Sequence, residues 1–349
     1  MLVHPSFRLN GKAYERNALD LAAQQWAVSS DKDQQGVGHF LVDWLSDDEH
    51  IALHTSGSTG KPKEIQMPKT AMYASAVRTA AFFNLSEGDS ALLCLPIRYI
   101  AGKMMLVRAL VLGLHLDIIP PKTKLPIEKN YTFAALIPLQ ANTSFDVLGR
   151  FKTVLIGGAP ITTDLRKRIS KKYKHCIETY GMTETLTHVA TRVVSDAVIP
   201  FTAMPGIGIA TDENDCLVLE VPYLPLSPLV TQDVVRLEGR DSFRLFGRRD
   251  WVINSGGMKI FPEALEEVLT PFIKFPFFFT ALPDANLGEQ LVLLVEAPAT
   301  EKTAIMAIAQ QHLGANKHHI PKQVICMDAF MHTHSGKLDR KATIKRLHM

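Results

Sequence analysis

The first segment of the chain that could do chemistry is a run of hydroxyl, glycine and lysine residues, His54-Thr55-Ser56-Gly57-Ser58-Thr59-Gly60-Lys61-Pro62-Lys63. Glycines let a ligand approach the backbone, while N–H, O–H and ammonium groups bind phosphate oxygens. The run is not a Walker A loop, because only two residues separate Gly57 from Gly60 and Pro62 follows Lys61. Such a run can wrap polyphosphate, but a loop of this composition is more often a plain polar turn, so the run alone decides little.

Three further segments follow in order along the chain. The first is Tyr180-Gly181-Met182-Thr183-Glu184-Thr185. The second is Gly247-Arg248-Arg249-Asp250, which leads into Asn254-Ser255-Gly256-Gly257-Met258-Lys259-Ile260-Phe261-Pro262-Glu263, and the third is Ser335-Gly336-Lys337. Four ordered motifs in one chain are a far more specific signal than any one of them.

Together these motifs resemble the adenylate-forming superfamily of acyl-CoA synthetases, peptide-synthetase adenylation domains and luciferases. The resemblance extends from Ile51 to the end of the chain. It departs from the family at the front, where members usually carry a long N-terminal region before the phosphate loop. Short members of this kind resemble o-succinylbenzoate–CoA ligases of menaquinone biosynthesis.

The resemblance implies two successive reactions. A carboxylic acid is first joined to ATP, giving acyl-AMP and pyrophosphate, and the thiol of coenzyme A then displaces AMP. Positioning and cation placement supply most of the acceleration in a phosphoryl-centre reaction of this kind. By resemblance, Glu184 holds Mg²⁺ and Thr183 binds the α-phosphate. The residues that hold the β- and γ-phosphates are Thr55, Ser56, Gly57, Ser58, Thr59, Gly60 and Lys61.

Adenosine recognition is assigned in the same way. Tyr180 offers its ring to the purine, and Gly181 and Met182 continue its motif. The segment Gly157-Gly158-Ala159-Pro160 passes along the other side of the base, so Gly158, Ala159 and Pro160 are candidate AMP-binding residues. Asp233 accepts from the ribose hydroxyl groups and Arg248 assists. The alternatives are an ordinary carboxylate at the start of a strand for Asp233 and a core aromatic residue for Tyr180.

Asp250 matches the family hinge, at which a C-terminal domain rotates between the two half-reactions. A plain inter-domain linker is the alternative. Lys337 matches the lysine that serves adenylation as a point charge between carboxylate and phosphate. After the rotation, Gly256, Gly257 and Lys259 replace it and serve the coenzyme A step.

The acyl pocket is expected between residues 96–108 and 186–189. Its candidate cations for a second substrate carboxylate, such as that of o-succinylbenzoate, are Arg98, Lys103 and Arg108. A helix at 101–113 is apolar around most of its circumference, so it should be buried and its charges should be paired or extended to water. Lys103 and Arg108 are about 140° apart on that helix, which argues against one shared site. Tyr99 and Gly102 are pocket candidates, and His188 serves either the pocket or core packing.

The helices and strands that must position these motifs follow different hydrophobic patterns along the chain. Between residues 51 and 156, short apolar runs alternate with longer helical segments at 68–84 and 101–113, and a further helix is expected at 165–172. This pattern predicts an α/β fold with parallel strands. After about Val189, short strands at 216–221, 233–238 and 242–247 predict an antiparallel or barrel-like closing piece. Beyond Asp250 we expect a small α+β unit with helices at 262–269 and 301–313 and strands at 277–282, 290–296 and 323–327. The expected domains are 1–249, which binds ATP and the acyl group, and a mobile 250–349.

Composition excludes several other classes of protein. The 349 residues are 46% apolar and 21% charged, and 38 Lys and Arg stand against 35 Asp and Glu, so a nucleic-acid-binding surface is not indicated. No apolar run reaches the length of a membrane span. The four cysteines lack metal-ligand spacing and predict free thiols in a reducing cytoplasm. The partners expected are a small carboxylic acid, ATP and coenzyme A. Another acid–CoA ligase, a carrier-protein-loading enzyme and a non-catalytic nucleotide-binding protein stay open as alternatives.

Overall fold

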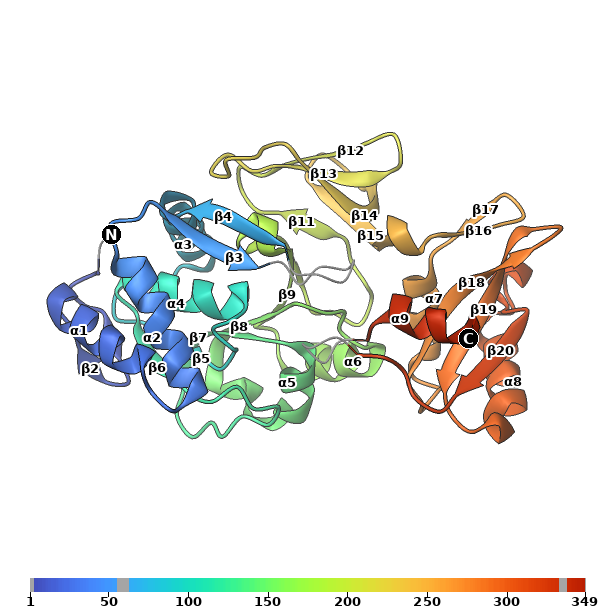
Figure 1. The fold of residues 1–349 in the computed structure, drawn as a ribbon, viewed down its shortest axis with the longest axis horizontal. Coiled ribbons are helices and arrows are strands. Elements are labelled where there is room, and N and C mark those ends of the chain that lie inside the picture. Colours follow the sequence, from blue (N-terminus) through green and yellow to red (C-terminus); the bar gives the residue numbers. More distant parts are fainter. Residues whose placement is uncertain (1–2, 55–62, 333–337, 349) are drawn as a thin grey trace.

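One long sheet runs through the first two thirds of the computed structural model, which describes residues 3–54, 63–332 and 338–348 (Figure 1). Within these ranges the sheet has 13 strands. Their order is β12 (Gly208–Thr211), β13 (Cys216–Glu220), β14 (Leu229–Leu237), β15 (Ser242–Arg248), β11 (Phe201–Ala203), β10 (His188–Val193), β9 (Cys176–Gly181), β8 (Phe151–Ile156), β7 (Tyr131–Leu136), β5 (Ser90–Leu93), β6 (His115–Ile118), β1 (Arg8–Leu9) and β2 (Lys12–Ala13).

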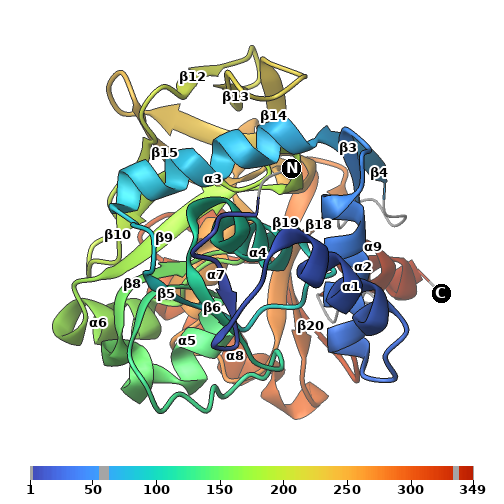
Figure 2. The ribbon, with the colours of Figure 1, turned by 90° about the vertical axis from the view of Figure 1, so that its left-hand side faces the viewer.

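The predicted α/β part of the sheet contains β1, β6, β5, β7, β8 and β9. Neighbouring strands in this order pair in parallel. Successive residues of a strand point to opposite faces, so Leu93 packs into one hydrophobic core and Leu92 into another. The helices on the Leu93 face are α1 (Arg16–Ala27), α2 (Lys32–Leu45), α3 (Lys69–Phe83) and α4 (Ile100–Leu112), as Figure 2 shows. The other face carries α5 (Pro138–Thr143), η1 (Phe145–Arg150) and α6 (Thr163–Lys172).

The three predicted helices of this part are confirmed to within two residues at each end. The hydroxyl of Thr162 caps α6 by accepting from the backbone N–H of Leu165 at 3.4 Å. Asn84 and Gly113 end α3 and α4 in the left-handed conformation. Pro68 lies one residue before α3, at its N-cap. None of the helices in the described ranges has the length and apolar composition that a bilayer crossing needs.

The strand predicted at 51–54 exists, but its expected place in the parallel sheet is wrong. It is β3 (His50–His54), which pairs antiparallel with β4 (Glu64–Pro68) in a separate two-stranded sheet. The reason is visible in its burial, since Ile51 and Leu53 are buried while their neighbours are exposed. Strands of a parallel sheet are buried on both faces, whereas such alternation suits an antiparallel pair with one wet face.

The strands from β10 to β15 form the predicted closing piece, and all their pairings are antiparallel. They continue the same sheet instead of forming a second one (Figure 1). The pairing register shifts between His188 and Ala190 and again between Val234 and Val235. Irregularities of this kind bend a sheet and increase its twist.

Residues beyond Asp250 carry the predicted small α+β unit. Its sheet has the order β17 (Met258–Ile260), β16 (Ile253–Ser255), β19 (Gly288–Glu296) and β18 (Phe277–Asp284), with β20 (Gln323–Met327) parallel to β19. Leu293 faces a core with α7 (Pro262–Leu269) and α8 (Lys302–Leu313), and Leu294 faces one with α9 (Arg340–Lys345). The short 3₁₀ turns outside the site are η4 (Ala299–Glu301), η5 (Lys317–His319) and η6 (Arg346–His348).

A buried charge cluster ties α6 to strands β9 and β10. Arg166 Nη2 donates to Glu178 Oε2 at 2.6 Å, and Arg192 donates to both oxygens of Glu178 at 2.7 and 2.9 Å. The Glu178 and Arg166 side chains are only 6% and 2% exposed. Because a buried charge is costly without its partner, this cluster fixes β9, the strand that ends in the Tyr180 motif.

We therefore predict that Glu178→Gln lowers the free energy of unfolding by about 3 kcal/mol, because two buried guanidinium groups lose their anion. Urea unfolding measures the change. Asp164→Asn is the matched control, since it removes an exposed ion pair with Arg168 and should cost less than about 1 kcal/mol. Equal losses in the two variants would contradict this account of the cluster.

Candidate active site

Three side chains from separate motifs meet at the end of β9. The hydroxyl of Tyr180 donates to Asp233 Oδ2 at 2.5 Å, and Arg248 Nη1 lies 3.9 Å from Asp233 Oδ1. Strands β14 and β15 place Asp233 directly opposite Arg248. The structure thus brings together a phenol, a carboxylate and a guanidinium group that the sequence motifs singled out independently.

This meeting requires the sheet to curl. Strands β10, β11 and β15 lie between β9 and β14 in the sheet order, and four strand spacings in a flat sheet would separate β9 from β14 by about 19 Å. The ring of Tyr180 packs against Phe201 of β11 and Phe243 of β15, with centroids 5.9 and 5.3 Å away. These aromatic rings fill the concave side of the curl, beneath the hydroxyl–carboxylate contact.

Burial sets the protonation of this cluster. Tyr180 is 8% exposed, and burial with the neighbouring Asp233 carboxylate raises the pKa of its phenol. The phenol therefore stays protonated and donates to Asp233. The second carboxylate oxygen of Asp233, which faces Arg248, remains available to accept a further hydrogen bond. Stacking on a purine by Tyr180 and ribose binding by Asp233 stay predictions.

The loop after β9 holds the candidate phosphate and metal residues. Thr183 and Glu184 lie half-buried in η2 (Thr183–Thr185). The hydroxyl of the fully buried Thr185 accepts from the backbone N–H of Met182 at 2.9 Å and donates to the carbonyl of Thr187 at 2.8 Å, which fixes the loop. Gly181 has no room for a side chain because the backbone of residues 187–188 packs against it.

Glu184 suits the Mg²⁺ assigned to it by resemblance. No ion pair in the described ranges includes Glu184, and no group of three potential metal-ligating side chains occurs there. Mg²⁺ is usually held by one or two protein carboxylates together with substrate phosphates and water, so a single half-buried carboxylate fits this ion.

The candidate segment for the second face of the base is the connection between β8 and α6. Gly158, Ala159 and Pro160 are exposed there, directly after the buried end of β8. Because β8 and β9 are parallel neighbours, this segment and the Tyr180 motif leave the sheet at the same edge. That edge, at the carboxyl ends of parallel strands, is where ligands of α/β folds bind.

The three candidate cations for a second carboxylate have different surroundings. Arg98 is exposed and lies 4.8 Å from the ring of Tyr99, which is half-buried. Lys103 Nζ donates to the carbonyl of Ala52 at 3.4 Å, and burial lowers the pKa of its ammonium group. Gly102 is buried at the start of α4, and a Cβ there would lie 2.5 Å from the carbonyl oxygen of Pro96.

Arg108 lies deeper, two turns further along α4, where it is 2% exposed. It donates to the hydroxyl of Thr187, and its Nη1 lies 3.5 Å from the sulfur of Met105. No ion pair in the described ranges includes Arg108, and burial lowers the pKa of its guanidinium to about 10. Arg108 is therefore a buried cation that lacks an anionic partner in this part of the chain.

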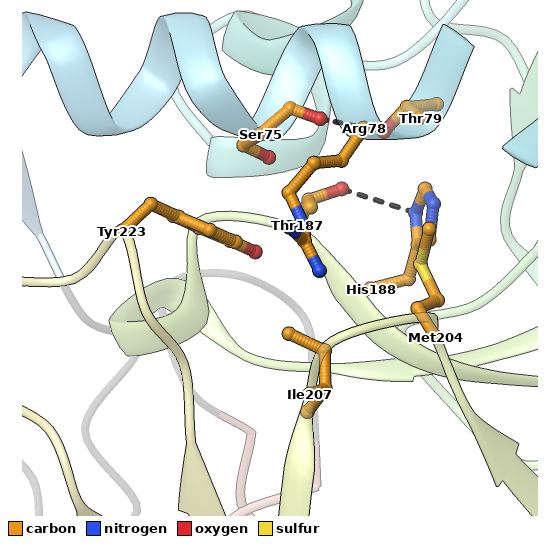
Figure 3. Close-up of a pocket in the computed structure, with 8 residues that line it drawn as sticks. All are labelled: Ser75, Arg78, Thr79, Thr187, His188, Met204, Ile207 and Tyr223. Carbon is orange, nitrogen blue, oxygen red and sulfur yellow. Dashed lines mark hydrogen bonds between the residues drawn. The ribbon is translucent and has the colours of Figure 1, made fainter. Parts of the chain in front are cut away.

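Thr187, which accepts from Arg108, lines a small pocket together with His188 (Figure 3). The pocket lies between α3 and the loops that follow β11 and β13. Its lining residues are Ser75, Arg78, Thr79, Thr187, His188, Met204, Ile207 and Tyr223. About 180 Å³ of space lies between its atoms, part of it open to solvent, but the gap is too narrow to admit a water molecule.

His188 is kept neutral by its surroundings. Burial and the nearby Arg108 lower the pKa of His188 well below its ordinary value, so the imidazole is neutral. The hydroxyl of Thr187 accepts from Arg108 and lies 3.0 Å from His188 Nδ1. His188 Nε2 is buried without a partner in the described residues.

The candidate coenzyme A residues form the turn of a two-stranded hairpin. Gly256 and Gly257 have φ values of +58° and +79° between β16 and β17, as a tight two-residue hairpin turn requires. Lys259 Nζ lies 3.7 Å from Asp215 Oδ2 at the exposed turn between β12 and β13. The hinge candidate Asp250 lies in η3 (Arg249–Trp251) and accepts from Arg248 Nη2 at 3.4 Å.

Two groups of candidate residues lie outside the described part of the structure. They are Lys337 and the phosphate-loop residues Thr55, Ser56, Gly57, Ser58, Thr59, Gly60 and Lys61. Their assigned roles stay predictions from the sequence.

Thr187 and His188 lie within the segment 186–189 that the sequence analysis expected at a pocket. Sequence reasoning missed the other six lining residues, which are Ser75, Arg78, Thr79, Met204, Ile207 and Tyr223. Arg78 donates to the carbonyl of Pro205, and its guanidinium lies 5.5 Å from the ring of Tyr223. Nothing in the local pattern around Arg78 or Tyr223 indicates that α3 and the segment after β13 meet.

Comparison with known proteins places the chain. Residues 11–228 match the model of the family described as AMP-binding enzymes. The chain is 25% identical over 326 residues to the 2-succinylbenzoate–CoA ligase of Listeria monocytogenes, covering 84% of this chain and 69% of that protein.

Two solved structures also resemble the fold. An acyl-CoA synthetase (AMP-forming)/AMP-acid ligase II-like protein from Dyadobacter fermentans is 32% identical and superimposes with a TM-score of 0.59, covering 94% of this chain and 98% of that one. The O-succinylbenzoate coenzyme A synthetase of Bacillus subtilis, solved with ATP and magnesium ion, is 20% identical, with a TM-score of 0.73 over 84% of this chain and 69% of that one.

The neutral state of His188 makes a prediction about stability. Below about pH 6.5 the unfolded chain takes up a proton at this imidazole and the folded chain does not, so stability falls as the pH falls, by up to about 1.4 kcal/mol per pH unit. His188→Gln should therefore lose less free energy of unfolding between pH 7 and pH 5 than the parent protein, as measured by urea unfolding. The exposed His50→Gln is the control and should behave like the parent. The same loss in the parent and in His188→Gln would contradict the neutral, buried imidazole.

Proposed function

The chain belongs to the family of AMP-binding enzymes, and on that premise we propose that it is an ATP- and Mg²⁺-dependent acid–CoA ligase acting on 2-succinylbenzoate. The observation that carries this proposal is the meeting of Tyr180, Asp233 and Arg248 beside the Thr183–Glu184 loop. It puts groups suited to a purine, a ribose diol and phosphate at one edge of the sheet. The 2-succinylbenzoate–CoA ligase of Listeria monocytogenes, with 84% of this chain aligned, supports the choice of acid.

In the first half-reaction, a carboxylate oxygen of the acid attacks the α-phosphorus of ATP and pyrophosphate leaves. Tyr180 packs against the base, Asp233 accepts from the ribose and Thr183 donates to the α-phosphate. The loop from Thr55 to Lys61 holds the β- and γ-phosphates, and Lys337 supplies a point charge between the two reacting groups. Glu184 would hold Mg²⁺, which when bound would supply further positive charge for the reaction.

In the second half-reaction, the sulfur of coenzyme A attacks the acyl carbon and AMP leaves. We place the domain division at residues 249 and 250 and the hinge at Asp250, which lies exposed in a short turn between the two sheets. Rotation there moves Lys337 away and brings the hairpin of Gly256, Gly257 and Lys259 to the site. The two glycines leave room for the pantetheine arm, and Lys259 faces a phosphate of coenzyme A.

The second carboxylate of 2-succinylbenzoate needs a cation, and Arg108 suits it better than Arg98 or Lys103. Arg98 is exposed to water, and Lys103 is satisfied by a backbone carbonyl group. Arg108 is buried, lacks a carboxylate partner in the described ranges, and contacts Thr187 directly after the Tyr180 motif. A substrate carboxylate would compensate its charge. The proposal places the enzyme in the cytoplasm, where ATP and coenzyme A are available.

The function is tested by incubating the purified chain with ATP, Mg²⁺, coenzyme A and a panel of aromatic and aliphatic acids. Mass spectrometry should detect the thioester of 2-succinylbenzoate above those of the other acids. Thioester formation with a different acid would replace the substrate. Acyl transfer only to a carrier protein would indicate a carrier-loading enzyme, and nucleotide binding without any acid activation would indicate a non-catalytic binding protein.

The role of Arg108 predicts a selective loss. Arg108→Met should raise the KM for 2-succinylbenzoate about 10- to 100-fold, because a charge-assisted hydrogen bond is worth on the order of 1.5–3 kcal/mol, while the KM for a monocarboxylic acid of similar shape changes little. Lys103→Met is the control on the same helix and should affect both acids alike. Steady-state kinetics with both acids measure the split. Equal losses for the diacid and the monoacid in Arg108→Met would remove the assignment.

A further inference from the structure

One buried glutamine side chain joins three neighbouring segments of the chain. Gln140, in α5, is 3% exposed. Its Nε2 donates to the carbonyl of Cys94 at 2.8 Å and to the carbonyl of Lys122 at 3.0 Å, and its Oε1 accepts from the backbone N–H of Ile137 at 3.2 Å. Cys94 directly follows β5, Ile137 directly follows β7, and Lys122 lies in the connection that follows β6. A single amide group thus holds the chain where it leaves three strands.

These contacts lie at the same edge of the sheet as the candidate nucleotide-binding residues. Strands β6, β5 and β7 are parallel neighbours, and the parallel order continues through β8 to β9. Their carboxyl ends therefore share the edge at which the Tyr180 motif leaves the sheet. Gln140 itself has no N–H group left for a substrate, because its amide nitrogen carries two protons and both are donated to carbonyl groups. Any effect on a ligand must pass through the segments that it holds.

The segment that follows Cys94 is one of the two expected to form the acyl pocket. It runs through Pro96 and Tyr99 into α4. The carbonyl of Pro96 accepts from the backbone N–H of Tyr99 at 3.1 Å, and a Cβ on Gly102 would lie 2.5 Å from the same oxygen. This turn is therefore packed closely against the first turn of α4. Its path is set at two points, by Gln140 at Cys94 and by Gly102 at Pro96.

We propose that Gln140 is a positioning residue for the carboxylic acid substrate, which acts by holding the segment 96–99 and the start of α4 in place. This inference rests on the proposed function, in which that segment and Arg108 of α4 form the acyl pocket. Without the amide, the buried carbonyl of Cys94 loses this donor and the segment is free to shift. A displacement of about 1 Å in a substrate-positioning group costs up to about 100-fold in rate.

The hydrogen bonds of Gln140 connect it to the acid more closely than to the nucleotide. Both N–H groups hold the chain beyond β5 and β6, on the side of the acyl segment. The carbonyl oxygen holds only Ile137, which is the N-cap residue of the same helix. A variant that keeps the oxygen and removes the N–H groups therefore separates the two effects.

The test measures the KM for the acid and the KM for ATP separately in the full-length protein, with 2-succinylbenzoate or the acid that the panel identifies. Gln140→Met has nearly the same size but no N–H group. It should raise the KM for the acid about 5- to 30-fold and leave the KM for ATP within about twofold. Gln140→Glu keeps the acceptor for Ile137 and loses the amide donors, so it should raise the KM for the acid as well.

Ser144→Ala is the matched control at the other end of α5. Ser144 is 4% exposed, and its hydroxyl accepts from the backbone N–H of Leu125 at 2.8 Å. This variant removes a buried hydrogen bond from the same helix but not from the end of β5. It should lower the free energy of unfolding, as Gln140→Met does, and leave both KM values like those of the parent. A rise in the KM for the acid in Ser144→Ala equal to that in Gln140→Met would overturn the proposal.

A double variant identifies the segment through which Gln140 acts. Adding Gln140→Met to Tyr99→Ala should raise the KM for the acid by less than about twofold beyond Tyr99→Ala alone. Full multiplication of the two effects, a parent-like KM for the acid in Tyr99→Ala or in either Gln140 variant, or equal rises in the KM for the acid and for ATP would each contradict the proposal. If Gln140→Met does not fold, Gln140→Glu carries the same comparison. A parent protein that activates no acid would instead overturn the proposed function.

Discussion

The hydrogen bond between Tyr180 and Asp233 is the contact on which the candidate site depends. It joins the last parallel strand to a strand four places away in the sheet order, so it can exist only because the antiparallel half of the sheet curls back. The bends in β10 and β14 allow the curl, and the rings of Phe201 and Phe243 fill its concave side. The three candidate nucleotide-binding side chains therefore meet because of how the sheet packs on itself.

Rigidity behind the site comes from buried charge. Glu178 lies two residues before Tyr180 on the same strand, and its two arginine partners fasten that strand to α6 and β10. Arg108, by contrast, is buried and has no carboxylate partner in the described part of the chain. The two arrangements have different consequences, since a compensated cluster stabilises the fold while an uncompensated cation favours an anionic ligand. The first arrangement suits a scaffold, and the second suits a substrate pocket.

The elements that the sequence predicted well are those with a strong local pattern. The strand 323–327 and the helix 262–269 were placed to the residue, because proline, turn residues and apolar periodicity mark their ends. The helices α1 and α2 were not predicted, although Asp31 caps the second by accepting from Asp33 and Gln34. The alternating burial of β3 signalled an antiparallel partner, and reading it as a parallel strand ignored that alternation.

The residues of the candidate site could be predicted from sequence motifs, but their arrangement in space could not. Tyr180, Asp233 and Arg248 were each identified from their sequence context, but their meeting depends on the curl of the sheet, which no local pattern encodes. Thr187 and Arg108 are 79 positions apart, and their contact joins α4 to the residue just before β10, which no local pattern indicates. The choice among Arg98, Lys103 and Arg108 likewise required knowing how deeply each side chain is buried. The position of a residue in a helix indicates the direction of its side chain, but not which residues surround it.

The central claim is that the Tyr180–Asp233–Arg248 cluster binds ATP for the activation of a carboxylic acid. Exchange of labelled pyrophosphate into ATP, measured without coenzyme A, tests it most directly. Exchange should require the acid, and Asp233→Ala should raise the KM for ATP about 10- to 100-fold, because the ribose would lose a charge-assisted hydrogen bond, without changing the KM for the acid. Exchange that proceeds without acid, or a KM for ATP that Asp233→Ala leaves unchanged in a folded protein, would contradict the account.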